Sequence, residues 1–106
     1  NKALAINPKE ADTLHNKAIS LGMLKRFEES IMCFDKALII DPQNDNSWCG
    51  KGNSLAGLGL FYEAKICYDQ ALKINPKHFN AQINKAFANQ NVPWKPVDPD
   101  KPKKLN

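Results

Sequence analysis

Apolar residues along the chain recur every three or four positions, in blocks separated by short polar breaks. One block carries Leu14, Ala18, Leu21 and Leu24, and after a break at Lys25–Arg26 a second block carries Phe27, Ile31, Phe34, Ala37, Leu38 and Ile40. This spacing places the apolar residues of each block on one face of an α-helix. The second helix is expected to stop at Pro42, because proline disfavours helical geometry in the residue before it. The pattern therefore predicts pairs of amphipathic helices.

The same pattern returns with a period of 34 residues. Pro8, Pro42 and Pro76 are each 34 positions apart, and residues 11–44 and 45–78 are identical at 12 of 34 positions. A fixed period of this length is typical of repeat proteins, in which one unit cannot bury its apolar faces alone and stacking of neighbouring units buries them. The 34-residue period therefore determines the predicted fold class.

The residues at set offsets within each copy identify the kind of repeat. The second copy has Trp48, Gly52, Leu55, Ala64, Tyr68, Ala71 and Pro76, and the first has Leu14, Ala18, Leu21, Ser30, Phe34, Ala37 and Pro42. This signature resembles the tetratricopeptide repeat, a helix–turn–helix unit. The resemblance implies an all-α fold, a short right-handed α-solenoid. Lys17, Lys51 and Lys85 depart from the leucine that the family prefers, and we expect their stems to cover apolar surface while the ammonium groups reach water or nearby acids.

The period divides the chain into five parts. Residues 1–10 match the end of a truncated preceding repeat, 11–44 and 45–78 are whole repeats, and 79–91 are the first helix of a further repeat or a capping helix. Residues 92–106 form a Pro/Lys-rich tail, whose prolines exclude a helix and favour an extended run. We expect Val92, Trp94 and Val97 to fold back and cover the helix over 79–91.

Composition and charge narrow the possible functions. Lys and Arg number 15 against 11 Asp and Glu, a net charge of +4, which is weak support for nucleic-acid binding. No window approaches the ~18 unbroken apolar residues of a membrane span. His15 and His78 are isolated, without a Cys or carboxylate at ligand spacing, so the sequence predicts no metal, no cofactor and no catalytic site.

The cysteines number three and follow no disulfide pattern, which favours a reducing, cytoplasmic location. Cys33 and Cys67 occupy equivalent positions and are expected to pack as small apolar side chains. Cys49 lies on a first helix, so we expect it to be exposed and the most reactive of the three.

The family resemblance also implies where a ligand would bind, since first helices line a concave groove. The residues on that face are Asn16, Ile19, Asn46, Gly50, Asn53, Asn80, Asn84 and Phe87. Asparagine amides both donate and accept hydrogen bonds, so they suit the backbone of an extended peptide. Gly50 and Gly57 are expected to leave room for it. A chaperone-type carboxylate clamp is disfavoured, because Cys49 replaces its lysine although Asn53 and Asn84 match its asparagines.

These observations favour a non-catalytic scaffold that binds a protein or peptide partner in the groove. One alternative is the substrate-selecting repeat region of a larger enzyme, such as a glycosyltransferase or a kinase. Another is an RNA-binding helical repeat, whose affinity would fall steeply with salt. Incomplete repeats at both ends also predict homo-oligomers through exposed apolar faces.

Overall fold

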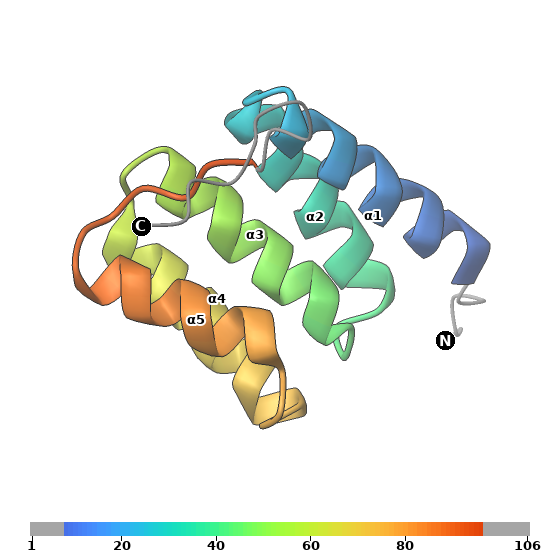
Figure 1. Cartoon of the computed structure of the whole chain (residues 1–106). Helices are drawn as coiled ribbons and strands as arrows, with labels where there is room; N and C mark the ends of the chain where they lie inside the picture. The colour runs from blue at the N-terminus through green and yellow to red at the C-terminus, as the bar shows by residue number, and fades with distance from the viewer. Residues whose placement is uncertain (1–7, 97–106) are drawn as a thin grey trace, which may run out of the picture.

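The computed structural model describes residues 8–96, and these form helices joined by short turns (Figure 1). The elements are α1 (Pro8–Met23), α2 (Phe27–Ile40), α3 (Asp45–Gly57), α4 (Phe61–Ile74) and α5 (Phe79–Asn89). The helices α1 and α2 form the first pair, α3 and α4 form the second, and α5 packs against the second pair. The expected all-α repeat fold is confirmed.

The first helix begins earlier than the repeat pattern predicted. Its first residue is Pro8, whereas the two later first helices begin at Asp45 and Phe79, three residues after their prolines. The boundary expected after residue 10 is therefore displaced, and residues 8–10 belong to α1. The remainder of the expected preceding repeat, residues 1–7, lies outside the described residues.

Small residues let the two helices of a pair approach closely. A Cβ added to Gly52 would stand 2.7 Å from the Tyr68 ring, a distance that no real side chain tolerates. Around this contact a core gathers Cys49, Leu55, Ala56, Ala64, Cys67, Tyr68, Ala71, Ala81 and Ala88, all of them buried. Because alanine and cysteine dominate this core, the helix backbones pack close together, and Tyr68 is its largest fully buried side chain.

The first helix of each repeat ends in the same hydrogen-bonded turn. In α1, α3 and α5 a residue with positive φ follows the helix: Lys25 (φ 62°), Gly59 (φ 81°) and Asn91 (φ 57°). The next N–H donates back to a carbonyl of the last turn, as Arg26 does to Leu21 at 2.9 Å. This is the Schellman motif, which satisfies carbonyls that the helix end leaves without partners.

Two members of the lysine ladder, the repeat-equivalent residues Lys17, Lys51 and Lys85, pair with acids of the preceding second helix. Lys51 Nζ lies 2.7 Å from Asp35 Oδ1, and Lys85 Nζ lies 2.6 Å from Asp69 Oδ1. The expectation that these ammonium groups reach nearby acids is confirmed for both lysines. Within residues 8–96, no helix has the length and apolar character needed to cross a membrane.

Candidate functional site

The candidate site is the face formed by α1, α3 and α5, here called the groove face. Three depressions lie along it. The first is lined by residues of α1, α2 and α3 together with Trp94, the second by residues of α1, α3 and α5 together with His78, and the third by residues of α3, α4 and α5 together with residues 92–95. Their volumes are about 60, 220 and 240 Å³. The second depression is lined by His15, Ile19, Asn46, Cys49, Gly50, Asn53, His78 and Asn80.

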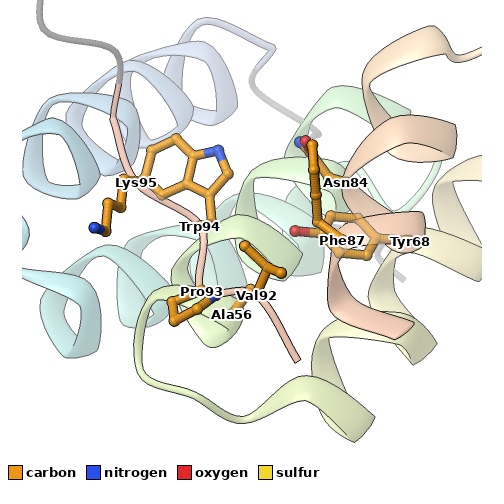
Figure 2. A pocket seen from close by; sticks show the side chains of 8 residues that line it. All are labelled: Ala56, Tyr68, Asn84, Phe87, Val92, Pro93, Trp94 and Lys95. Carbon is orange, nitrogen blue, oxygen red and sulfur yellow. The ribbon is translucent and has the colours of Figure 1, made fainter. Parts of the chain in front are cut away.

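Most of the predicted groove residues line these depressions. Ile19, Asn46, Gly50, Asn53 and Asn80 line the second one. Asn84 and Phe87 line the third one, shown in Figure 2. Asn16 is exposed on α1 but lines none of the three.

The central asparagines bind each other. The Tyr68 hydroxyl donates to Asn53 Oδ1 at 2.7 Å, and Asn84 Nδ2 donates to the same oxygen at 2.8 Å. Both acceptor directions of that carbonyl are thereby used. Asn53 and Asn84 therefore join the helices α3, α4 and α5. The Asn53 carbonyl is already hydrogen-bonded within the protein and is not available to a peptide.

Asn46 is also engaged with the protein. His78 is the residue before α5, and its Nδ1 accepts from the Ala81 N–H at 3.1 Å. Its proton therefore resides on Nε2, which donates to Asn46 Oδ1 at 2.8 Å. His78 thus caps a helix and bridges two repeats, a role that its sequence position did not indicate. The exposed groove residues left for a partner include Ile19, Asn80 and Phe87.

The expected role of the glycines was wrong. A Cβ at Gly50 would stand 2.3 Å from Phe34, and a Cβ at Gly57 would stand 2.5 Å from Phe27. Both glycines make space for aromatic rings of the protein itself. Their lack of a side chain serves the packing of α2 against α3, and the room they leave is already filled.

The expectation for Cys49 was also wrong. All three cysteines are free thiols and all are buried, and Cys49 is only 4% exposed. Burial raises the pKa of the Cys49 thiol to about 12, although a hydrogen bond with Asn84 opposes this. Because the thiolate is the reactive form, Cys49 is protected in the folded protein. Cys33 and Cys67 pack as buried apolar side chains, as predicted.

A histidine and a serine meet on the groove face without forming a catalytic pair. His15 Nδ1 lies 2.7 Å from Ser47 Oγ, a distance that would suit an activated nucleophile. Ser47, however, is completely buried, so no substrate can reach its hydroxyl. Among the described residues, no group of three His, Cys, Asp or Glu side chains could hold a metal ion.

The segment after α5 also lines the groove, which the sequence did not indicate. Val92, Pro93, Trp94 and Lys95 form one wall of the third depression, opposite Tyr68, Asn84 and Phe87 (Figure 2). Val92 and Trp94 fold back beside Phe87 of α5. The cover they give is partial, because Ile83 stays 36% exposed and Phe87 49% exposed. Val97 lies outside the described residues.

Helix pairs stacked in register define the class of an α-helical repeat protein. Two family models of the tetratricopeptide repeat match the chain, one over residues 11–44 and one over residues 46–78. The chain belongs to the tetratricopeptide repeat family. A search among curated proteins gave no significant match.

Solved structures share the fold. One is described as the first TPR of Spaghetti (RPAP3) bound to the HSP90 peptide SRMEEVD. It is 16% identical, with a TM-score of 0.50, and the alignment covers 83% of this chain and 97% of that chain. At this identity the likeness shows the helical-repeat fold.

Proposed function

We propose that this protein is a non-catalytic interaction module that binds an extended segment of a partner protein on its groove face. The observation that carries the proposal is the row of three depressions along α1, α3 and α5. A row of this kind suits an elongated ligand, which can place successive side chains in successive depressions. The Spaghetti domain holds a peptide, which supports this use of the fold.

The chemistry of the groove face favours a ligand bound mainly by shape and apolar contact. Ile19, Ile83 and Phe87 are exposed apolar side chains of α1 and α5. The Asn80 side chain is exposed beside them and offers both a donor and an acceptor to a peptide backbone. The proposed ligand is therefore an extended peptide with apolar side chains, held by contacts that do not depend on a strong charge.

A matched pair of isoleucines tests this proposal. Ile19 is 42% exposed on the groove face, and Ile39 is 82% exposed on the second helix α2. Replacing either with glutamate adds the same charge to an exposed position. We expect Ile19→Glu to lose the partners that the full chain captures from a cell lysate, and Ile39→Glu to keep them, with captured proteins measured by quantitative mass spectrometry.

Asn80→Glu gives an independent variant on α5, and Gln82→Glu, also exposed on α5, is its control. If the two members of each pair retained the same partners, groove binding would be contradicted. Asn53 and Asn84 are unsuitable as probes, because their replacement would also remove hydrogen bonds that join α3, α4 and α5.

We also propose a cytoplasmic location, supported by three cysteines that are all free thiols. Self-association through the end of α5 stays a prediction, supported by the exposed Phe79 side chain. Light scattering over a range of concentrations measures it, and a constant monomeric mass would contradict it.

A further inference from the structure

The chain lays its own extended segment across the groove face. After α5, residues 92–96 run back over α3 toward the turn between α1 and α2 (Figure 1). The Trp94 ring meets the Phe27 ring edge-on, with centroids 6.2 Å apart and an interplanar angle of 74°. The same indole lines both the first depression, between α1 and α3, and the third depression, beside α5. Trp94 therefore stands between two of the three depressions.

The end of α5 explains why the segment leaves toward the groove. In α1 and α3 the positive-φ residues are Lys25 and Gly59, which are 34 positions apart, so the equivalent position in α5 is 93. That residue is Pro93, and the helix closes two residues earlier, with positive φ at Asn91. Two residues are about 200° of rotation around an α-helix. The chain therefore leaves α5 on nearly the opposite side from a chain that would begin a second helix.

Local contacts hold this exit. The Val92 N–H donates to the Phe87 carbonyl at 2.9 Å, and both residues line the same depression. An apolar contact between these two positions commonly accompanies a Schellman turn. Figure 2 shows Val92, Pro93 and Trp94 on one side of the depression, with Phe87 and Tyr68 on the other. Pro93 stiffens the exit further, because its ring fixes φ.

We propose that residues 92–96 are an intramolecular ligand of the groove face, and that a partner binds there by displacing them. This inference rests on the proposed function. The segment also indicates the class of partner: an extended, proline-containing peptide that places a large aromatic side chain where Trp94 lies. Such a peptide arrives with little backbone freedom left to lose, because proline restricts its unbound states.

Residues 92–96 lower the affinity of a partner peptide because the peptide has to displace them. A segment joined to the groove by a short linker acts at an effective concentration of the order of millimolar. A competing peptide binds only the fraction of molecules in which the segment has left, so its apparent affinity falls by that fraction. Weakening the segment raises the fraction, and a peptide added in solution then binds more tightly.

The first measurement asks whether Trp94 is docked in solution. The chain has two tryptophans, so Trp48→Phe in the full chain leaves Trp94 as the single indole. We expect its emission to be blue-shifted and its quenching by acrylamide to be several-fold weaker in buffer than in urea. Emission and quenching equal to those in urea would overturn the inference, and the Ile19 and Ile39 variants would then still test groove binding by itself.

The second measurement asks whether the segment competes. The probe is a fluorescently labelled synthetic peptide with the sequence of residues 90–101, added to full-length wild-type and Trp94→Ala chains. We expect the variant to bind it at least tenfold more tightly by fluorescence anisotropy. A peptide with alanine at the tryptophan position should bind neither chain. Tyr62→Ala, which truncates a 74% exposed aromatic of α4, should behave as wild type.

A second variant guards against loss of fold. Val92→Ser weakens the same segment from the Phe87 side and should raise peptide affinity in the same direction, with circular dichroism confirming the helices. Equal affinity for wild-type and variant chains would overturn the inference. Binding to none of the chains would also overturn it, because the segment would then be a fixed part of the fold. Partner capture that depends on Ile19 would show that the proposed function survives either result.

Discussion

Two junctions of equivalent geometry join the repeats, and their buried polar groups lie in different places. The first junction joins residues 11–44 to α3, and the second joins residues 45–78 to α5. At three equivalent positions the first has Ile19, Phe34 and Gly50, and the second has Asn53, Tyr68 and Asn84. In the first junction the Phe34 ring packs against Gly50. The second set forms hydrogen bonds from Tyr68 and Asn84 to one carbonyl.

The two junctions show the opposite difference at other positions. In the first junction Ser54 lies 2.9 Å from Ser30 Oγ, and Ser30 donates to the Ala18 carbonyl at 2.7 Å. The equivalent residues of the second junction are Ala64 and Ala88, both fully buried. The hydrogen-bonded residues His15 and Ser47 likewise correspond to Cys49 and Ala81.

The comparison shows that buried polar residues differ between the two junctions as whole hydrogen-bonded sets. A hydroxyl or amide left without a partner inside a protein costs about 1–3 kcal/mol, whereas replacing both partners with apolar groups costs little. None of the buried side-chain nitrogen or oxygen atoms in the described part of the chain lacks a partner. Each junction therefore carries complete hydrogen-bonded sets, and single exchanges between the junctions should be costly.

The largest effect is expected from the glycine of the first junction. Gly50→Ala places a Cβ 2.3 Å from the Phe34 ring, and overpacking of this kind should lower the free energy of unfolding by about 3 kcal/mol. Gly22→Ala is the control, because its Cβ would meet Ser30 at an ordinary 3.4 Å. Urea unfolding followed by circular dichroism measures both. Equal stability of the two variants would show that the ring moves aside freely.

Phe34→Tyr and Tyr68→Phe should lower the free energy of unfolding by different amounts. Phe34→Tyr adds a hydroxyl where Ile19 replaces the accepting asparagine, and should cost about 2 kcal/mol. Tyr68→Phe removes one hydrogen bond of 2.7 Å while Asn84 still donates to Asn53, so it should cost about 1 kcal/mol. The same unfolding measurement compares them. A smaller loss of stability for Phe34→Tyr than for Tyr68→Phe would contradict the conclusion that the polar residues of each junction belong to one hydrogen-bonded set.

The serine pair allows a double-mutant cycle. Ser30→Ala leaves the Ser54 hydroxyl, 2% exposed, without its partner, and should cost about 1.5 kcal/mol. The double variant Ser30→Ala/Ser54→Ala reproduces the alanine pair of the second junction and should recover most of that loss. Additive losses in the cycle would show that the two hydroxyls act independently.

A smaller, stabilising effect is expected at the turn after α1. Lys25 has φ 62°, where the second repeat has Gly59 at φ 81°. Positive φ is costly for a residue with a Cβ and free for glycine. Part of the gain is offset because glycine is more flexible when unfolded. Lys25→Gly should therefore raise the free energy of unfolding by about 0.5 kcal/mol, and Lys36→Gly, inside α2, should lower it by about 1 kcal/mol.

The smallest effect concerns pH. Burial lowers the pKa of His15 below its usual 6.5, with the Asp12 charge opposing the shift. The unfolded chain then binds more protons than the folded chain just below pH 6.5, so stability is present above that pH and falls as the solution is acidified. Unfolding at pH 7 and pH 5 should show a smaller loss for His15→Gln than for wild type. An equal loss would place the titrating group elsewhere.

Much of the fold could be predicted from the sequence by itself. The 34-residue period, the apolar spacing and the prolines determined the helix pairs and the repeat family, because each depends on local geometry or on residues that recur at a fixed interval. The pairing of the lysine ladder with nearby acids also followed from that register. Cys33 and Cys67 were correctly expected to be buried, since both lie on the apolar face of a second helix.

The groove face stays a prediction, and the contacts of several residues on it were decided by neighbours distant in sequence. Gly50 and Gly57 face rings from α2, Cys49 is buried beside α5, and Asn53 binds Tyr68 and Asn84. Spacing within a helix gives the direction of a side chain, but it does not say what an adjoining repeat places there.

The path of residues 92–96 was likewise decided by tertiary structure. The sequence determined that they would be extended, because their prolines exclude a helix. Their direction depended on where α5 closes, at Asn91 rather than at the repeat-equivalent position, and on Phe27 being available to receive Trp94. The composition of a segment sets its local conformation, whereas the surface it covers depends on the helix end from which it leaves and on the side chains it then meets.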